Sequence, residues 1–286
     1  MISVIILTWN SSDHIEECLS SLFQEIERAG REVEVFVIDG NSRDRTPEIL
    51  SRFEKEHDQL EVITLEKNMG TTVSRNIGID KSKGKFLLFL DSDTVIKPGL
   101  LSNLPEALEK DQKIGVLAPR LLYKDGTIQP SCKKFPTLPI KLTKFIPSEN
   151  LRRWASSREL YREAIYSKSF DEPIEVDHCI SAVWLVRRKV MEEIGGFDER
   201  IFYAPEDVDF CLQTWLAGYK VIYQPQVEVI HETQRIAYRD LRLTWKHVKG
   251  LFYYFRKYNY TFRRKKIYER ISNINEDFER RKLKNL

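Results

Sequence analysis

One short stretch, residues 85–93 (KFLLFLDSD), limits most strongly what this chain can fold into. Its apolar run is too short for a helix that buries every face, and it is bounded by Gly84 and by charge. A continuous apolar run of this length predicts a strand buried on both faces of a parallel sheet. In open α/β sheets ligands lie just outside the carboxyl ends of the strands. Asp91 and Asp93 therefore stand where a bound molecule would be expected.

These two aspartates can be interpreted in two ways. Carboxylates one residue apart can offer oxygen ligands to a divalent cation, and a cation at a sheet edge would hold a phosphate. Alternatively, Asp91 and Asp93 are turn and cap residues, which Asp and Ser favour after a strand. The stretch alone leaves both interpretations open, and the rest of the chain favours the first.

Strand and helix patterns alternate along the first 93 residues. We expect strands at 3–7, 33–38, 60–65 and 86–90, with a helix after each of the first three. Ser11, Ser12 or Asp13 is expected to cap the first helix, and Thr46 with Pro47 to start the second. The β-α-β-α-β-α-β order predicts an α/β fold with a Rossmann-like, mostly parallel sheet flanked by helices.

A polar crevice follows from this topology, because the carboxyl ends of parallel strands lie along one edge of the sheet. The polar residues that follow the four strands are Thr8 and Asn10, Asp39, Asn68, and Asp91 with Asp93. Neither of the glycine-rich phosphate loops GxxxxGK[ST] and GxGxxG occurs in the sequence. Any phosphate in this crevice must therefore be held by a metal or by side chains.

The second half of the chain is patterned less regularly. We expect helices from residue 98 and at 151–167, 188–194 and 236–260, and strands at 114–118, 175–187, 220–223 and 227–230. Residues 119–147, rich in Pro, Lys and Thr, are expected to form an irregular, mobile loop near a ligand. Glu206, Asp207 and Asp209 crowd the start of a helix, where the helix dipole tolerates acids without any catalytic role.

The total charge of +3 hides an uneven distribution. Residues 239–286 contain fifteen Lys and Arg against five Asp and Glu, a net charge of +10 that leaves −7 for the remainder. This basic, aromatic segment predicts contact with an anionic membrane surface, or else a solvated or homodimer-forming helix. Nucleic acid is a disfavoured partner, because the body of the chain is acidic and no matching motif occurs.

Cysteine use and hydropathy suggest a cytoplasmic protein. The four cysteines have no paired metal-binding spacing, and Cys18 and Cys211 fall in helical patterns as small core residues. We therefore expect a reducing compartment and no disulfide framework. No run reaches the length of a membrane span and no secretory signal pattern opens the sequence.

Six motifs occur in order along the chain. They are residues 3–10 (SVIILTWN), 38–46 (IDGNSRDRT), 68–70 (NMG) with 75–78 (RNIG), 91–93 (DSD), 195–199 (GGFDE) and 206–209 (EDVD). Over residues 2–235 the chain closely resembles family 2 glycosyltransferases of the GT-A fold, especially their rhamnosyltransferase-like bacterial branch. The resemblance implies a glycosyltransferase domain at 1–235, with a nucleotide-binding half at 1–95 and an acceptor and catalytic half at 96–235. Residues 236–286 would be a helical basic extension.

The resemblance also implies roles for individual residues on the donor side. Thr8, Asn10 and Asp39 would line the nucleoside pocket. Arg75 would approach the base or the phosphates, with pairing to an acidic neighbour as the alternative. Asp91 and Ser92 would lie near the ribose. Asp93 would bind Mg²⁺ or Mn²⁺ that bridges the diphosphate, and His231 would complete the metal site or be merely structural.

On the acceptor side the resemblance makes Asp207 the general base that deprotonates the acceptor hydroxyl. Glu206 and Asp209 would support the acceptor, although Asp209 could equally satisfy a buried donor. Trp9 and Trp184 could stack on base or sugar, and core packing is the alternative for both.

The implied activity is a metal-dependent, inverting transfer of one sugar from a nucleotide-diphosphate sugar to an acceptor hydroxyl. The acceptor would be a glycan or a lipid-linked saccharide in surface glycan biosynthesis, reached from the inner face of the plasma membrane. The Gln-x-x-Arg-Trp signature of processive synthases is absent, which favours one transfer per acceptor.

The sequence departs from the family pattern in two places. Gly40 and Asn41 are displaced, with Arg45 where Gly is usual, and Ser181-Ala182 replaces Gly-Ala, so the donor sugar is not defined. A sugar-1-phosphate nucleotidyltransferase is the rival enzyme, but the glycine-rich basic loop expected after its first strand is missing. A degenerate binding scaffold would be expected to have lost Asp93 or Asp207, and both are present.

Overall fold

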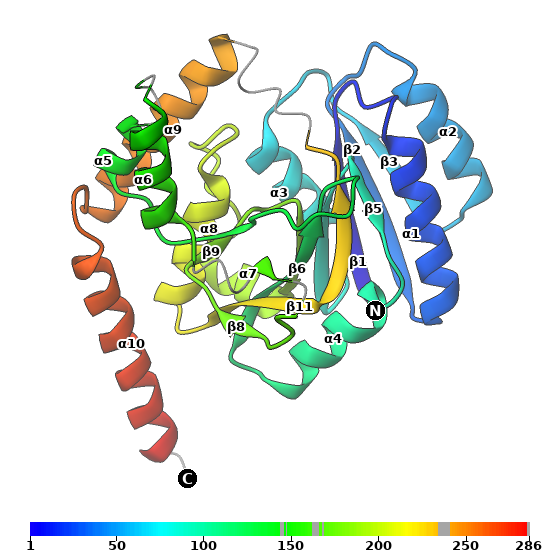
Figure 1. The fold of residues 1–286 in the computed structure, drawn as a ribbon. Coiled ribbons are helices and arrows are strands. Elements are labelled where there is room, and N and C mark those ends of the chain that lie inside the picture. Colours follow the sequence, from blue (N-terminus) through cyan, green and yellow to red (C-terminus); the bar gives the residue numbers. More distant parts are fainter. Residues whose placement is uncertain (144–145, 147, 162–165, 168, 234–240, 285–286) are drawn as a thin grey trace.

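The computed structural model, drawn in Figure 1, is built around one nine-stranded sheet. It describes residues 1–143, 146, 148–161, 166–167, 169–233 and 241–284. The strands are β1 (Ile2–Thr8), β2 (Val33–Asp39), β3 (Leu60–Thr64), β4 (Phe86–Asp91), β5 (Thr94–Ile96), β6 (Ile114–Leu122), β7 (Cys132–Lys133), β8 (Ile174–Glu175), β9 (His178–Cys179), β10 (Val183–Arg187) and β11 (Lys220–His231). The helices are α1 (Ile15–Ala29), α2 (Thr46–Glu56), α3 (Thr71–Lys81), α4 (Leu100–Lys110), α5 (Leu138–Thr143), α6 (Glu149–Glu159), α7 (Arg188–Ile194), α8 (Glu206–Leu216), α9 (Leu241–Tyr258) and α10 (Lys265–Lys284).

The sheet is mixed but mostly parallel, in the order β3-β2-β1-β4-β10-β6-β11-β5, with β8 beside β11. The strands β3, β2, β1 and β4 run parallel, as do β6 and β11. The antiparallel β10 lies between β4 and β6, and β5 pairs antiparallel with β11. The predicted α/β class, with its parallel first half, is confirmed. The short pair β7–β9 lies outside the main sheet.

Both faces of the sheet are covered, which explains the continuous apolar run of β4. Leu88 and Leu90 pack in a core with residues of α1, α2 and α4. Leu87 and Phe89 point to the opposite face, because successive side chains of a strand alternate. There they share a second core with residues of α7, α8, α9 and α10. Each fully buried aliphatic side chain of this kind contributes about 1.5–3 kcal/mol to folding.

The C-terminal extension is helical where it is described, as expected, and it belongs to the second core. Helix α9 contributes Leu251, Tyr254, Phe255 and Tyr258, and α10 contributes Ile267. In Figure 1 α10 runs along one side of the molecule toward the C-terminus. Residues 236–240 and 285–286 of the predicted extension lie outside the described residues, and the division into domains stays a prediction.

The caps of the first two helices differ from expectation. Helix α1 begins after His14 without a side-chain cap, and the Ser11 carbonyl accepts the N–H groups of His14 (3.0 Å) and Ile15 (2.9 Å) instead. The Ser11 N–H donates to Thr46 Oγ1 (2.8 Å), so Thr46 holds the loop after β1 rather than capping α2. Asp44 Oδ1 accepts the Thr46 N–H at 3.0 Å.

The expectation of an irregular loop at 119–147 is wrong in part: residues 123–131 and 134–137 have no helix or strand, but three other stretches are regular. Strand β6 continues through Pro119 to Leu122, because β11 runs beside it with Gln224 opposite Pro119. β7 and α5 follow within the same span. The predicted strands 220–223 and 227–230 are one strand, β11, with an irregularity between Gln224 and Glu228.

The helix predicted at 151–167 is shorter than expected. Helix α6 begins after Ser148, whose Oγ accepts the N–H of Leu151 at 3.4 Å, and it ends at Glu159. Leu160 is extended and forms an isolated β-bridge to Lys133, which takes the backbone out of the helix. Residues 162–165 of the predicted helix lie outside the described residues.

We expect Gly78→Ala on α3 to destabilise the fold, because α3 packs closely on β1 at this point. A Cβ at position 78 would lie 2.6 Å from Ile5 Cγ2. Overpacking of this kind costs roughly 1–3 kcal/mol, against about 1 kcal/mol gained in helix propensity, so a net loss of up to about 2 kcal/mol is expected in urea unfolding. Asp80→Ala, at an exposed position of the same helix, should change stability by less than about 0.5 kcal/mol. If the clash causes the loss, Ile5→Ala and Gly78→Ala combined will cost less than their sum.

Candidate functional site

The carboxyl ends of β1, β2 and β4 meet at one edge of the sheet. The parallel register pairs Thr8 with Asp39 across β1 and β2, and Leu7 with Asp91 across β1 and β4. Residues from four separate parts of the sequence are added to this edge by the β4–β5 turn, β11, α3 and α8. At the edge where the topology predicts a polar crevice, the structure therefore has a compact cluster of charged side chains.

The residues predicted for the nucleoside pocket do come together. The Asp39 carboxylate accepts hydrogen bonds from Thr8 Oγ1 (2.9 Å), from Ser42 Oγ (2.5 Å) and from the Ser42 N–H (2.9 Å). Thr8 and Asp39 are buried, whereas Asn10 is exposed and its Oδ1 accepts the N–H of Arg43 at 2.9 Å. Thr8 and Asp39 thus form the floor of this corner and Asn10 its rim. Their contact with a nucleoside stays a prediction.

Ser92 lies in the turn between β4 and β5, and its Oγ donates to Ser11 Oγ at 3.0 Å. Both serines are buried. The contact ties the Asp91-Ser92-Asp93 turn to the loop after β1. Ser92 therefore holds two strand ends together, and its predicted place near the ribose stays a prediction.

Three potential metal ligands converge beside this turn. One ligand atom each from Asp91, Asp93 and His231 lies within 4.8 Å of the others, and His231 Nε2 is 3.5 Å from Asp93 Oδ1. The antiparallel pairing of β5 and β11, which places His231 opposite Thr94, brings the histidine to the aspartates. Two carboxylates and an imidazole suit Mg²⁺ or Mn²⁺, so the residues present fit such an ion.

The charges of the cluster influence one another. Burial lowers the pKa of His231, but its hydrogen bond to Asp93 and the charge of Asp93 outweigh burial and raise it above the ordinary value. Partial burial raises the pKa of Asp91, Arg75 opposes this, and the negative charges of Asp93 and Asp207 add to it. The cluster therefore concentrates negative charge that a cation would neutralise.

Sequence reasoning missed Gln129, which orients the histidine. The Gln129 side-chain nitrogen donates to Thr233 Oγ1 at 2.6 Å, and its Oε1 lies 2.8 Å from His231 Nδ1. Because Oε1 can only accept, His231 donates an Nδ1 proton to it, and this contact points Nε2 at Asp93. Gln129 falls in the span interpreted as a loop, and a single glutamine gives no signal in the sequence.

Arg75 on α3 joins the two halves of the site. Its side chain is buried, and Nη2 donates to the Ser181 carbonyl at 3.0 Å. Nη2 is also 3.5 Å from Asp91 Oδ1, and Nη1 is 3.7 Å from Glu206 Oε1. The alternative considered for Arg75, pairing with acidic neighbours, is what the structure shows. Contact with base or phosphates stays a prediction.

Glu206 and Asp207 open α8 but have different environments. Glu206 is buried and accepts a hydrogen bond from Ser181 Oγ at 3.0 Å. Burial raises the pKa of Glu206 to about 8, the charge of Asp207 adds to the rise, and the attraction of Arg75 does not cancel it. Asp207 is only half-buried, and its Oδ1 accepts the N–H of Val208 at 2.8 Å. Of the pair, Asp207 is the carboxylate that a second substrate could reach.

Two predicted acceptor-side residues point into the core instead. Trp184 has no exposed surface, because β10 lies between β4 and β6 and its ring stacks on Phe210 with 5.9 Å between ring centroids. The prediction that Trp184 contacts base, sugar or acceptor is therefore wrong, and the core alternative holds. Asp209 is 2% exposed and accepts hydrogen bonds from Lys257 and Tyr258, so it satisfies buried donors, as the alternative had it. Trp9 remains 39% exposed beside the site.

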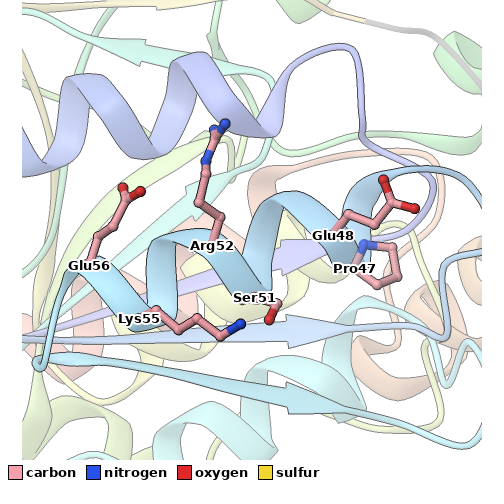
Figure 2. Close-up of a pocket in the computed structure, with 6 residues that line it drawn as sticks. All are labelled: Pro47, Glu48, Ser51, Arg52, Lys55 and Glu56. Atoms are coloured by element: carbon pink, nitrogen blue, oxygen red, sulfur yellow. The ribbon is translucent and has the colours of Figure 1, made fainter.

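Two surface hollows lie outside this cluster. Figure 2 shows one on the outer side of α2, lined by Pro47, Glu48, Ser51, Arg52, Lys55 and Glu56. A second lies between α1 and α2, where His57 stacks on Phe23. Both are lined by residues of α1, of α2 or of the loop after α2, and neither lining includes a residue of the candidate site. The candidate site is defined by its converging side chains and not by the depth of a hollow.

Comparison with known proteins decides the family. The model of the family "Glycosyl transferase family 2" matches residues 3–195. The chain is a family 2 glycosyltransferase. Its resemblance to that family, noted from six short motifs, is thereby confirmed.

Individual relatives agree with this assignment. The chain is 27% identical over 258 residues to an N-acetylglucosaminyl-diphospho-decaprenol L-rhamnosyltransferase of Mycobacterium tuberculosis, covering 84% of the chain and 78% of the relative. Among solved structures, TarS 1–349 of S. aureus in complex with UDP-GlcNAc matches with a TM-score of 0.55 at 22% identity, over 82% of this chain and 59% of that one. A mannosyltransferase of Pyrobaculum calidifontis in complex with GDP-Man and Mn²⁺ matches with 0.56 at 18% identity, over 87% and 72%. These two structures support the GT-A fold of the glycosyltransferase.

We expect the stability of the glycosyltransferase to depend on pH through Glu206. Its folded-state pKa of about 8 lies above the ordinary 4.5, so the folded state holds a proton that the unfolded chain loses earlier. This contribution to stability is complete below about pH 4.5 and is lost as the pH rises through about 8. Urea unfolding of metal-free protein should show the wild type losing stability relative to Glu206→Gln across this window. Exposed Glu106→Gln should follow the wild type, and parallel curves for wild type and Glu206→Gln would contradict the expectation.

Proposed function

We propose that this glycosyltransferase is metal-dependent and inverting, and that it moves one sugar from a nucleotide-diphosphate sugar to an acceptor hydroxyl in surface glycan biosynthesis. One observation carries the proposal: Asp91, Asp93 and His231 converge at the sheet edge, and buried Arg75 links that edge to the start of α8, where Asp207 is accessible. The nucleotide sugars and Mn²⁺ named for the TarS and P. calidifontis structures support the same ligand classes here.

Asp91, Asp93 and His231 would hold the divalent cation. When bound, a Mg²⁺ or Mn²⁺ ion supplies positive charge that neutralises the departing nucleoside diphosphate. Gln129 keeps His231 Nε2 turned toward that position. Thr8, Asn10 and Asp39 would line the nucleoside, at the neighbouring end of the same edge.

Asp207 would act on the acceptor. Its carboxylate takes the proton of the acceptor hydroxyl, and the freed oxygen attacks the anomeric carbon of the donor sugar. The new C–O bond forms on the face opposite to the bond that breaks, and that bond's electron pair leaves with the diphosphate. Attack from the opposite face inverts the anomeric centre, through an oxocarbenium-like state as in glycoside cleavage.

Glu206 is the poorer candidate for this base. It is buried, accepts the Ser181 hydroxyl and lies 3.7 Å from Arg75 Nη1. Its raised pKa keeps it largely protonated at neutral pH, whereas a general base must be ionised to accept a proton. Glu206 therefore has a supporting role between the proposed donor and acceptor sides of the site. Ser181, in place of the usual glycine, contributes to this support through its hydrogen bond to Glu206.

We further propose a glycan or lipid-linked saccharide as the acceptor, reached by peripheral binding at the cytoplasmic face of the membrane. The named substrate of the mycobacterial relative is a polyprenyl diphosphate saccharide, which favours this class. On α9, Trp245 and Phe252 are each 62% exposed, and their spacing of seven residues puts them on one face. Lys249 Nζ lies 5.9 Å from the Trp245 ring centroid. Aromatic and basic side chains on one helix are typical of interfacial binding. Among the described residues, no helix is long and apolar enough to cross a membrane.

The donor site is tested by thermal unfolding with UDP-glucose, UDP-GlcNAc, GDP-mannose and dTDP-rhamnose, with and without Mn²⁺. A donor at 100 times its Kd should stabilise the wild type by about 2.7 kcal/mol, and only with metal. Asp93→Ala should abolish this shift. Asp207→Asn should keep it and lose roughly 10²–10⁴-fold in transfer rate, the usual contribution of general-base catalysis.

Exposed Asp80→Ala serves as the control and should behave as wild type in this assay. A shift that is equal without Mn²⁺, or that survives in Asp93→Ala, would contradict the metal site. The absence of any shift in the wild type would favour the scaffold alternative.

Membrane binding is tested by sedimentation with vesicles of phosphatidylcholine containing phosphatidylglycerol. Trp245→Ala combined with Phe252→Ala should lower the bound fraction about tenfold or more, because burying each aromatic side chain contributes about 1.5–3 kcal/mol. Binding of wild type to pure phosphatidylcholine should be weaker, since the basic residues then meet no anionic lipid. Equal sedimentation of the wild type and the double variant would contradict the proposed membrane binding.

A further inference from the structure

One lysine of the C-terminal extension contacts both ends of the segment that contains Glu206 and Asp207. Residues 198–209 include Glu206 and Asp207, and they begin and end with an aspartate. Lys257 Nζ on α9 lies 2.8 Å from Asp198 Oδ2, 2.8 Å from Asp209 Oδ1 and 2.9 Å from Asp209 Oδ2. The side chains of Asp198 and Asp209 are only 8% and 3% exposed.

Further donors complete the environment of the two carboxylates. Tyr253 Oη on α9 donates to Asp198 Oδ2 at 2.9 Å, and Arg200 donates to both Asp198 oxygens. Tyr258 Oη on α9 donates to Asp209 Oδ1 at 2.9 Å, and Gln213 Nε2 donates to Asp209 Oδ2 at 2.8 Å. Three of the groups that face this pair, Lys257, Tyr253 and Tyr258, therefore come from α9.

Helix α9 also contacts the backbone directly before Glu206. A Cβ on Gly250 would lie 2.3 Å from the Ala204 carbonyl oxygen and 3.3 Å from Pro205 Cδ. Such an approach is open only to glycine, because any larger residue would push α9 away from the segment.

Helix α3 supports the same segment from the donor half. The Thr71 N–H donates to the Phe202 carbonyl at 2.8 Å, and Thr72 Oγ1 donates to the Ile201 carbonyl at 2.7 Å. A Cβ on Gly70 would lie 2.3 Å from the Phe202 carbonyl oxygen. The segment is thus bound by α3 on its donor side and by α9 through Gly250 and Lys257.

We propose that Lys257 is a positioning residue for sugar transfer, which holds segment 198–209 so that Asp207 faces the donor. This inference rests on the proposed function, and it makes α9 a part of the acceptor side of the active site. Lys257 touches neither substrate and acts through Asp198 and Asp209. Without its charge Asp209 loses the cation that contacts it and Asp198 keeps only Arg200, and breaking such buried pairs destabilises the segment that carries them.

The electrostatics agree with this geometry. Burial tends to raise the pKa of Asp198, but hydrogen bonds from Arg200, Lys257 and Tyr253 bring it well below its usual range. Burial raises the pKa of Asp209, although Lys257 opposes the rise. Asp198 is thus held ionised, and the charge of Asp209 depends on the lysine.

The test uses the full chain with Lys257→Met, Lys257→Arg and the control Lys189→Met, which removes an exposed lysine that is ion-paired within α7. Two quantities are compared: the Kd for UDP, GDP and dTDP with Mn²⁺, and kcat for turnover of the donor that the thermal panel identifies. Lys257→Met should keep the Kd within about twofold and lower kcat about 10–100-fold, since a displacement near 1 Å costs about 100-fold. Lys257→Arg should recover most of kcat, because it keeps the charge.

A second readout separates positioning from general stability. In Lys257→Met, amide hydrogen exchange should rise in residues 198–209 and stay unchanged in 86–93. If Lys257→Met does not fold, Asp198→Asn takes its place and should show the same split between kcat and Kd. A kcat for Lys257→Met within twofold of Lys189→Met, or equal loss of nucleotide binding and kcat, would overturn the inference. A wild type without metal-dependent nucleotide binding would instead refute the proposed function.

Discussion

The buried guanidinium of Arg75 is the interaction on which the arrangement of the site depends. It lies between Asp91 at the end of β4 and Glu206 at the start of α8, and it donates to the Ser181 carbonyl that precedes β10. Its Cζ atom lies over the rings of Phe89 and Phe197, at 5.6 and 5.3 Å from the ring centroids. A buried guanidinium needs carboxylate partners, and buried carboxylates need a cation, because an unpaired buried charge costs several kcal/mol. One buried side chain therefore joins the strand edge to the start of α8.

Around this cation the protein gathers more negative charge than Arg75 can balance. Asp91, Asp93, Glu206 and Asp207 influence one another's ionisation. Part of the excess is removed because the raised pKa of Glu206 favours its protonated form. A donor with an anionic diphosphate would be repelled by what remains, so a divalent cation is the natural third component. Binding of the proposed metal, binding of the proposed donor and the protonation state of these carboxylates would therefore be linked.

The sequence predicts the first half of the fold well because its signals are local. Apolar runs define β1 to β4, and the polar residues after each run place Thr8, Asp39, Asp91 and Asp93 at one edge. The second half depends on pairings between distant segments. The insertion of β10 between β4 and β6 buries Trp184, and no periodicity distinguishes that tryptophan from one that stacks on a sugar. Asp207 and Asp209 stand two residues apart, and only the position of α9 shows which one is accessible. Gln129 and Lys257 act through single long-range contacts and leave no pattern.

The close contact between Gly250 and Ala204 has a consequence for how such enzymes could be recombined. A chimera that is joined after β11 to exchange acceptor preference would combine α8 of one enzyme with α9 of another. In this structure α9 packs closely on α8 and on the segment before it. The exchangeable unit is set by this backbone contact, and it runs from the glycine pair after α7 to the end of α9. Variation in acceptor specificity would accordingly be inherited by both helices together with β11 between them, which pairs with β6 and carries His231.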